Sequence, residues 1–211
     1  TATDMTQTLT YTEGDSSVAI DDIAITEVDT VVASLDDGTV ETVTATVTLS
    51  DSAAGALTAS SGNGESYDSS TGVWSISAVS EETASTALAA MAFEPSTNQD
   101  VDITAAVSIT DADGEETTGT LTLDVTPVND APTATNTTQS LSFVEDDSSV
   151  DIDDIVITEV DTVVASLNDG TAETVSVTLT LSASDSGAFT AASGNGESYD
   201  SSTGVWSISS V

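Results

Sequence analysis

The sequence predicts an all-β protein made of antiparallel β-sandwiches arranged in tandem, and three observations support this. Apolar and polar residues alternate with a period of two in several short segments, which is typical of strands with one buried face. Val, Ile and Thr are abundant while aromatic residues make up only 4% of the chain, and β-branched residues favour strands. A long segment also recurs 132 residues further along, so the 211 residues hold more than one copy of their domain.

The predicted strands follow from the alternation. It is clearest in residues 43–49, 101–109 and 121–125, where one face is apolar and the other is rich in Thr and Ser. Weaker segments of the same kind are residues 6–12, 17–26, 56–60 and 73–77. About seven strands in roughly 130 residues is the size of an immunoglobulin-like β-sandwich.

Three local features complete the predicted domain. Residues 80–91 are rich in Ala and begin with Ser80 followed by two acids, which predicts a short helix crossing between the sheets. Residues 111–119 contain Asp-Ala-Asp-Gly between two good strands and predict a hairpin turn. Asp21 and Asp22 interrupt the alternation, which suggests a bulge within residues 17–26.

The repeat sets the domain organisation. Residues 1–79 and 133–211 align without gaps, and 59 of the 79 positions are identical. We therefore expect a complete sandwich over residues 1–130 and a second copy over residues 131–211, which lacks counterparts of residues 80–132. We expect the missing strands to come from a continuation of the same chain, in a long tandem array of neighbouring repeats. The alternative is that another chain supplies them.

Charge is the strongest global property of the sequence. It contains 37 acidic residues and no Lys, Arg or His, which gives a formal net charge of −37. Binding to nucleic acid or to an anionic membrane surface requires basic residues, so we expect neither. No apolar run approaches the roughly 20 residues of a membrane-spanning helix, so membrane insertion is not expected either.

The same composition argues against an enzyme. Ser and Thr are plentiful, but no His or Lys is present to activate them as nucleophiles. A pair of carboxylates could hydrolyse glycosides, but such a site needs an aromatic pocket for the sugar. Trp74 and Trp206 lie in predicted strands, where a place in the core is expected.

Metal binding is the chemistry that remains. Without His or Cys, the available ligands are oxygen atoms, which favour Ca²⁺ over Mg²⁺ and over softer metals. No EF-hand loop is present. Turn geometry alone would also explain many of the acids at strand ends. The candidate calcium ligands lie at the predicted strand ends, and they are Glu13, Glu27, Asp29, Asp111, Asp113, Asn129, Asp130, Glu145, Glu159 and Asp161.

Strand direction predicts which candidates meet. Successive turns of a sandwich lie at opposite ends, so the turn with Glu27 and Asp29 should share one end with the hairpin of Asp111 and Asp113. The other end faces the second copy. There we expect a junction set of Glu13, Asn129, Asp130, Glu159 and Asp161, with Glu145 as the second copy's equivalent of Glu13. Ca²⁺ takes six to eight oxygen ligands, which such sets and nearby carbonyls could provide.

Several motifs together resemble a known family. They are YTEGDSSVAI, ITEVDT, SYDSSTGVWSIS and ITDADGEETTGTLTLDVTPVNDAPT. They resemble the cadherin-like, immunoglobulin-like repeats of giant bacterial adhesins of the RTX type, which are exported by type I secretion. The resemblance implies an extracellular position at the bacterial cell surface and calcium ions at domain junctions. One departure is Glu27-Val28-Asp29, where the family often has Asp-x-Asp.

The resemblance implies a spacer that carries an adhesive tip away from the cell and is stiffened by calcium. Two alternatives remain open from the sequence. One is a subunit of a polymeric extracellular fibre, in which copies of the chain complete one another's sheets. The other is an adhesive module that binds a glycan or another surface, for which few aromatic residues are available.

Overall fold

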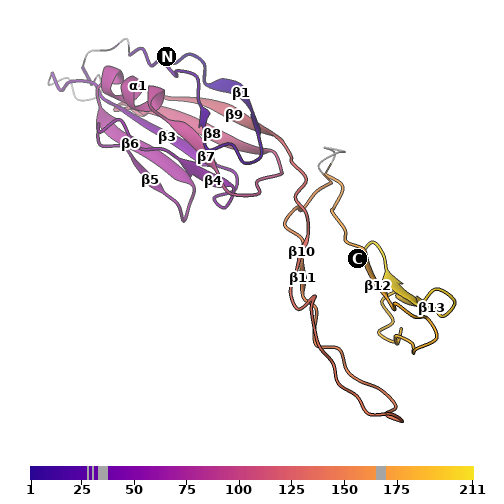
Figure 1. The fold of residues 1–211 in the computed structure, drawn as a ribbon. Coiled ribbons are helices and arrows are strands. Elements are labelled where there is room, and N and C mark those ends of the chain that lie inside the picture. Colours follow the sequence, from indigo (N-terminus) through magenta and orange to yellow (C-terminus); the bar gives the residue numbers. More distant parts are fainter. Residues whose placement is uncertain (28, 30, 33–37, 165–169) are drawn as a thin grey trace. The chain divides into compact units, whose positions relative to one another are not determined.

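The computed structural model describes residues 1–27, 29, 31–32, 38–164 and 170–211 (Figure 1). The described residues form two compact units. Unit 1 is Thr1–Val128, and unit 2 is the described part of the chain from Asn129 onward.

Unit 1 contains a six-stranded sheet with the order β1-β9-β8-β3-β6-β5. Neighbouring strands are antiparallel except β1 and β9, which are parallel and place Leu9 opposite Leu123. The strands are β1 (Thr6–Thr12), β3 (Val43–Leu49), β5 (Ser66–Asp68), β6 (Val73–Val79), β8 (Ile103–Asp111) and β9 (Glu116–Thr126).

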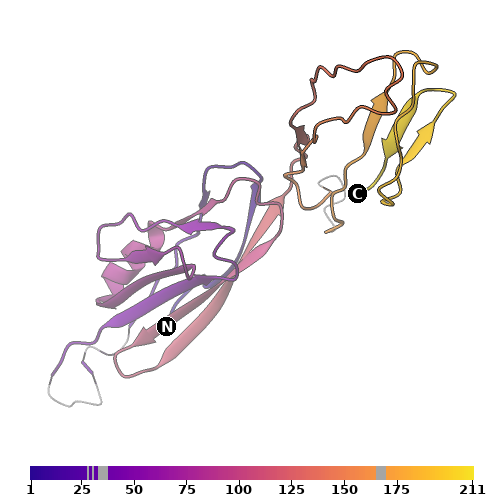
Figure 2. The same cartoon turned by 90° about the horizontal axis from the view of Figure 1, so that it is seen from below.

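A second, smaller sheet closes the sandwich. Its order is β2-β7-β4, with β2 at Val18–Ala19, β4 at Gly55–Leu57 and β7 at Ala92–Pro95. The core side chains between the sheets include Trp74, Phe93 and Leu121, all fully buried. Figure 2 shows the same sandwich from below. Unit 1 is therefore an all-β, immunoglobulin-like sandwich, as the sequence predicts.

One helix, the single one in the described part of unit 1, connects the two sheets. It is α1 (Glu81–Ala89), and Ser80 caps it by accepting a hydrogen bond from the Thr83 N–H at 3.2 Å. Ala84, Ala87 and Leu88 are its buried face, and the helix packs against β3 and β6. No helix among the described residues combines the length and apolar character that crossing a membrane would require.

The structure corrects the strand predicted over residues 17–26. It is a strand only at Val18–Ala19, and further along Ile25 makes a single antiparallel bridge with Ala2. At Asp21 the Gln7 side chain takes the place of a neighbouring strand. Its amide oxygen accepts a hydrogen bond from the Asp21 N–H at 3.0 Å, and its amide nitrogen donates one to the Asp21 carbonyl at 2.9 Å. The predicted bulge is therefore not formed, because no strand continues through Asp21 and Asp22. Ile20 and Ile23, on either side of these two residues, are both buried.

The sequence also missed β5 and β7. Their three and four residues are too short to show an alternating pattern. β7 also begins at Ala92, directly after the helix predicted over residues 80–91, so no turn signal separates the two elements.

Unit 2 has less regular structure than its sequence repeat predicts. It contains a two-stranded pair, β10 (Thr133–Ala134) with β11 (Ile157–Thr158), and a three-stranded sheet with the order β12-β14-β13. The strands of that sheet are β12 (Val177–Thr180), β13 (Ser198–Asp200) and β14 (Val205–Ile208). Val163 is the one buried hydrophobic side chain in the described part of unit 2.

The counterpart of β1, residues 138–144, is not a strand. Among the described residues of unit 1, the sheet neighbour of β1 is β9, and residues 133–211 contain no counterpart of β9. A strand without a hydrogen-bonding neighbour has nothing to hold it extended, which explains the difference.

Candidate metal centre

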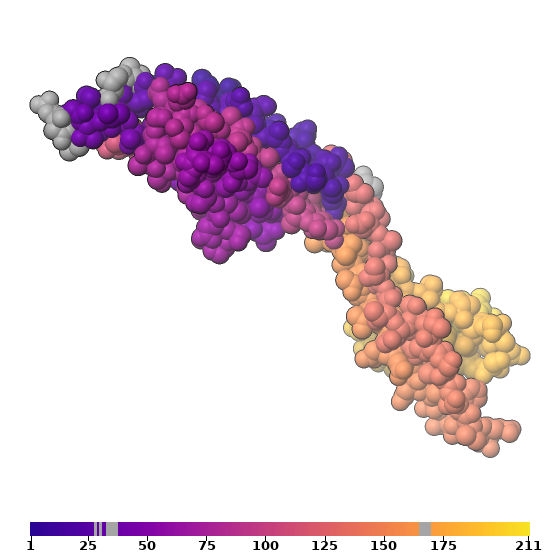
Figure 3. Space-filling view, turned by 60° about the vertical axis from the view of Figure 1, so that its left-hand side comes forward, coloured from indigo at the N-terminus to yellow at the C-terminus, as the bar shows by residue number. Residues whose placement is uncertain are grey.

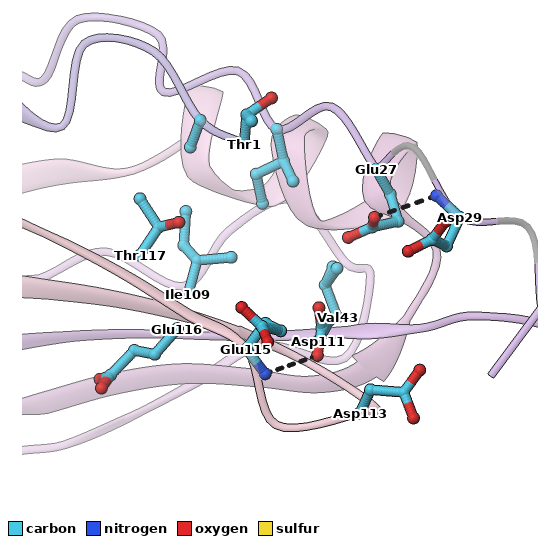
Figure 4. A pocket seen from close by; sticks show the side chains of 12 residues that line it. Thr1, Glu27, Asp29, Val43, Ile109, Asp111, Asp113, Glu115, Glu116 and Thr117 are labelled. Atoms are coloured by element: carbon cyan, nitrogen blue, oxygen red, sulfur yellow. Dashed lines mark hydrogen bonds between the residues drawn. The ribbon is translucent and has the colours of Figure 1, made fainter. Parts of the chain in front are cut away.

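A cavity of about 530 Å³ lies in unit 1 where the β8–β9 hairpin meets the segment around Ile25 (Figure 4). The four residues that the sequence assigns to this end, Glu27, Asp29, Asp111 and Asp113, all line it. Glu115 and Glu116 bring the number of acidic side chains around the cavity to six. Sequence reasoning missed these two, although they follow the Asp-Ala-Asp-Gly turn directly.

Glu27 and Asp29 are held on one side of the cavity by local hydrogen bonds. The Glu27 carboxylate accepts from the Asp29 N–H at 3.2 Å, as the dashed line in Figure 4 shows. The Glu27 N–H donates to the carboxylate of Glu81, in the first turn of α1. The start of the helix thereby positions this acidic pair.

The β8–β9 hairpin carries the acids on the other side. Asp111 accepts from the Glu115 N–H at 2.8 Å through its side chain, and its backbone N–H donates to the Glu115 carbonyl at 3.1 Å. Gly114 adopts φ +93°, a left-handed conformation that favours glycine, so the turn can close there. The hairpin therefore presents Asp111, Asp113 and Glu115 from one tight turn.

Glu41 supports this hairpin and was missed in the sequence. It is only 8% exposed, and its Oε1 atom accepts from the Ala112 N–H at 2.7 Å. Its other oxygen is buried and has no hydrogen-bond partner among the described residues. The sequence does contain a signal for its burial. Residues 43, 45, 47 and 49 of β3 are buried, and residue 41 continues this alternation by two residues.

All the ionisable side chains that line the cavity are acidic. The sequence contains no Lys, Arg or His to neutralise six carboxylates. Among the described residues, no three of them bring ligand oxygens within 4.8 Å of one another. Mutual repulsion keeps such groups apart, and a hard cation is the ligand whose charge and oxygen preference match them.

Glu13 lies near the end of β9, within unit 1. Its N–H donates to the Thr126 carbonyl at 3.0 Å, and its carboxylate accepts from the Val128 N–H at 2.8 Å. A residue just after β1 is thereby attached to the last residues of the unit.

Asp130 and Asp161 meet within unit 2. The Asp161 carboxylate accepts from the Asp130 N–H at 2.7 Å, and carboxylate oxygens of the two residues lie within 4.8 Å of one another. Glu159 Oε1 accepts from the N–H groups of Val160, at 2.9 Å, and of Asp161, at 3.4 Å. The Asn129 side chain donates to the Asp130 carbonyl at 3.1 Å.

Glu145 does not join a group of acids. It lies exposed in the turn after residues 138–144, and among the described residues it belongs to no cluster of three potential ligands. Its counterpart Glu13 is held by Val128, and the second copy contains no counterpart of Val128.

Comparison with known proteins shows neither a family nor a function for this chain. No family model matches the chain, and no curated protein matches it. Among solved structures the chain is similar to "Protocadherin Gamma B2 extracellular cadherin domains 3-6", with 10% sequence identity and a TM-score of 0.34. The alignment covers 100% of this chain and 43% of that one. Similarity at this level says nothing about ligands or partners.

Proposed function

We propose that the chain is part of the extender region of a long bacterial surface adhesin of the RTX type, in which Ca²⁺ stiffens neighbouring repeats. It would act outside the cell as a spacer, without enzymatic activity, and its partners would be neighbouring repeats of the same chain. The observation that carries the proposal is the cavity of unit 1, lined by six carboxylates in a chain without a basic residue.

Charge gives the first reason for a cation in this cavity. At physiological salt the Debye length is about 8 Å, so carboxylates around one cavity are screened much less than distant surface charges. A divalent cation would replace their repulsion with attraction. Ca²⁺ accepts six to eight oxygens in flexible geometry, which fits acids that come from two separate segments of unit 1.

A shared local motif gives the second reason. In unit 1 the Glu27 carboxylate accepts from the Asp29 N–H, and in unit 2 the Glu159 carboxylate accepts from the Asp161 N–H. These pairs are counterparts in the repeat. In unit 2 this motif also binds the linker, because Asp161 accepts from the Asp130 N–H. A motif that recurs in both copies, and that holds the linker in unit 2, suits an array.

Chain connectivity gives the third reason. Glu13 holds the Val128 N–H, and Asp161 holds the Asp130 N–H. Val128 and Asp130 are two residues apart, so their nitrogens are at most about 7 Å apart whatever the linker conformation. We therefore propose Glu13, Asn129, Asp130, Glu159 and Asp161 as the junction ligands.

Thermal melting of the full chain with different cations tests the proposal. At equal ionic strength, we expect Ca²⁺ to raise the melting temperature of unit 1 strongly, Mg²⁺ less, and Na⁺ least. A ligand at 100 times its Kd stabilises a folded protein by about 2.7 kcal/mol. The double variant Asp29→Asn with Asp113→Asn should lose most of the calcium effect.

The matched control replaces two exposed acids away from the cavity, Asp22→Asn and Glu94→Gln, and should keep the calcium effect. Equal stabilisation by Ca²⁺ and Na⁺ at matched ionic strength would mean simple screening and would contradict the proposal. Small-angle scattering in calcium and in chelator adds the mechanical readout, with a longer and stiffer chain expected in calcium.

An adhesive, glycan-binding module finds less support. Such sites stack aromatic side chains on sugars, but Trp74 is fully buried and Tyr11 is 5% exposed. The few aromatic residues of unit 1 are thus used in its core.

A further inference from the structure

The loop before β5, residues 61–65, folds around one of its own carboxylates. Glu65 accepts a hydrogen bond from the Ser61 N–H. The same carboxylate accepts from the N–H groups of Gly62, at 3.1 Å, and Asn63, at 2.9 Å. Three consecutive N–H groups are thus directed at a single side chain, so the backbone of the loop is held as far as Asn63.

The same loop forms in unit 2, where residues 193–197 have the identical sequence. Glu197 accepts from the N–H groups of Gly194, at 3.0 Å, and Asn195, at 2.9 Å. Unit 2 lacks most of the core of unit 1, so the loop geometry follows from its own residues and not from its surroundings. In the space-filling view of Figure 3, purple atoms from this part of unit 1 and yellow atoms from the end of unit 2 lie at the surface.

The next N–H of the loop, that of Gly64, is not used in this way. Among the described residues it makes no hydrogen bond, and Gly64 is exposed. A Cβ atom built on Gly64 would meet no atom within 4 Å outside its two chain neighbours, so the space beside its nitrogen is open. Gly196 in unit 2 is exposed and open in the same way.

Each of these glycines follows an asparagine whose side chain is little restrained. Among the described residues the Asn63 side chain forms no hydrogen bond, and that of Asn195 donates one to Ser193 Oγ at 3.1 Å. Asparagine is a thermolabile residue, because the next backbone nitrogen can attack its side-chain amide carbon. A glycine nitrogen that is exposed, free of hydrogen bonds and not shielded by a Cβ atom is well placed for this attack.

We propose that Asn63 and Asn195 are sites of spontaneous covalent modification in the folded chain, each converted to aspartate or isoaspartate. At the first site the Gly64 nitrogen loses its proton to the solvent and bonds to Asn63 Cγ. The bond from Cγ to Nδ2 breaks, and Nδ2 leaves as ammonia after taking a proton from the solvent. One water molecule then opens the cyclic imide at either of its carbonyl groups, which gives the two products. Water is the only co-reactant, and no oxidation or reduction takes place.

The modification adds a negative charge where one is already held. Two events change the formal net charge by two, from −37 to −39. A carboxylate at position 63 lies two residues from Glu65, and the sequence contains no Lys, Arg or His to neutralise the pair. Isoaspartate also lengthens the backbone by one carbon atom. Both products should therefore weaken the hydrogen bonds from Ser61 and Gly62 to Glu65 and loosen the loop.

Asn129 provides an internal comparison. Its side chain donates to the Asp130 carbonyl at 3.1 Å, and the Asp130 N–H donates to the Asp161 carboxylate at 2.7 Å. The nitrogen that would attack Asn129 is thus engaged in a hydrogen bond, and it belongs to a residue with a Cβ atom. We therefore expect Asn129 to remain unmodified in the folded chain.

Peptide mapping by mass spectrometry tests the proposal on the full chain, kept folded for days near neutral pH in the presence of a chelator. Trypsin has no cleavage site in a chain without Lys or Arg, so a protease specific for acidic residues is used. The two fragments are distinguishable, because Phe189 stands in one where Leu57 stands in the other. We expect the fragments with Asn63 and Asn195 to gain one mass unit and the fragment with Asn129 to stay unchanged. The rate should rise with pH, because the attacking nitrogen must lose its proton.

Variants separate the reaction from its effect on the loop. Asn63→Gln combined with Asn195→Gln should lose the mass gain, because glutamine would have to close a larger ring. Asn63→Asp imitates one product and should make hydrogen exchange of the Gly62 N–H faster than in the unmodified chain. Asn98→Asp, which adds the same charge outside the loop, is the matched control and should leave this exchange unchanged.

Two outcomes would overturn the proposed sites. One is a mass gain that is no faster at Asn63 and Asn195 than at Asn129. The other is a mass gain that appears in urea and not in the folded chain, which would show that the folded loop blocks the attack. Equal exchange of the Gly62 N–H in Asn63→Asp and Asn98→Asp would overturn the proposed loosening. None of these measurements involves a metal ion, so this inference and the proposed function can fail separately.

Discussion

At the residue scale, the acidic side chains of this chain differ in which groups stabilise their negative charge. The carboxylate of Glu65 accepts from the N–H groups of Gly62, at 3.1 Å, and Asn63, at 2.9 Å. Burial acts to raise the pKa of Glu65, but hydrogen bonds from the surrounding loop outweigh it and lower the pKa. The identical loop in unit 2 does the same for Glu197, so these acids need no cation.

The loop around Glu197 should have a local stability that depends on pH. Hydrogen bonds from its own backbone N–H, then from Ser193 and Gly194, lower the pKa of Glu197 from its ordinary 4.5 to about 2. A lowered pKa means that the ionised form stabilises the folded loop. This stabilisation should be complete above pH 4.5 and should be lost as the pH falls toward about 2.

An NMR titration of the Glu197 carboxyl group, with hydrogen exchange of the Gly194 N–H, checks this. The Glu197→Gln variant should remove the pH dependence of the protection of this N–H, measured relative to an unstructured peptide, between pH 4.5 and about 2. A carboxyl group that titrates near 4.5 would show that the loop does not hold the charged form.

Tyr11 shows how the acids affect the core. Burial, then the charges of Asp102 and Glu13, raise the pKa of Tyr11 to about 12. Its hydroxyl group is buried and has no hydrogen-bond partner among the described residues. A buried hydroxyl group without a partner is destabilising, because the water it gave up is not replaced by another hydrogen bond. The second copy has Phe143, without a hydroxyl group, at the same place.

At the scale of elements, β9 approaches Met5, the residue just before β1, so closely that only glycine fits at one point. A Cβ atom on Gly119 would lie 2.1 Å from the Met5 carbonyl oxygen and 2.5 Å from Met5 Cβ. Gly119 lies opposite Val107 in β8, so it cannot move away without disturbing the sheet. Close packing at Gly119 thus explains a glycine in the middle of a long strand.

We predict that Gly119→Ala lowers the free energy of unfolding of unit 1 by about 1–3 kcal/mol, because overpacking forces β1 away from β9. Urea unfolding followed by Trp74 fluorescence measures this, in a Trp206→Phe background so that only unit 1 is observed. Thr118→Ala, at an exposed neighbouring position, is the control. A change within about 0.5 kcal/mol would mean that β1 is not held where the structure places it.

At the scale of the whole molecule, a net charge of −37 opposes folding. Nearly all the buried hydrophobic side chains among the described residues belong to unit 1, so unit 1 holds the core that resists this repulsion. Stability should therefore depend strongly on screening even without calcium.

We predict that raising NaCl from about 0.1 M to about 1 M increases the melting temperature of unit 1 in chelator, because the Debye length falls from about 10 Å to about 3 Å. Differential scanning calorimetry measures the change. The same salt step near pH 4, where many carboxylates are protonated, should give a smaller increase. An equal increase at both pH values would show that salt acts on apolar hydration and not on charge.

Much of the fold was accessible from the sequence because it depends on local patterns. Alternation located β1 and β3, and Ser80 with its following acids located α1. The short strands β5 and β7 were missed because pairing with a neighbour, and not their own residues, makes them strands. Strand direction also placed Glu27, Asp29, Asp111 and Asp113 at one end of the sandwich, and they line one cavity.

The sequence by itself determined the all-β class, the repeat, the uniform negative charge and the restriction to oxygen ligands, because each follows from residue types and their order. Only the tertiary structure decided that Glu41 is buried beneath the hairpin and that Glu115 and Glu116 join the cavity. It also decided that residues 138–144 are not a strand although β1, their counterpart, is one. The physical reason is that burial and strand pairing require a partner from a distant part of the chain, and near-identical sequences with different partners form different structures.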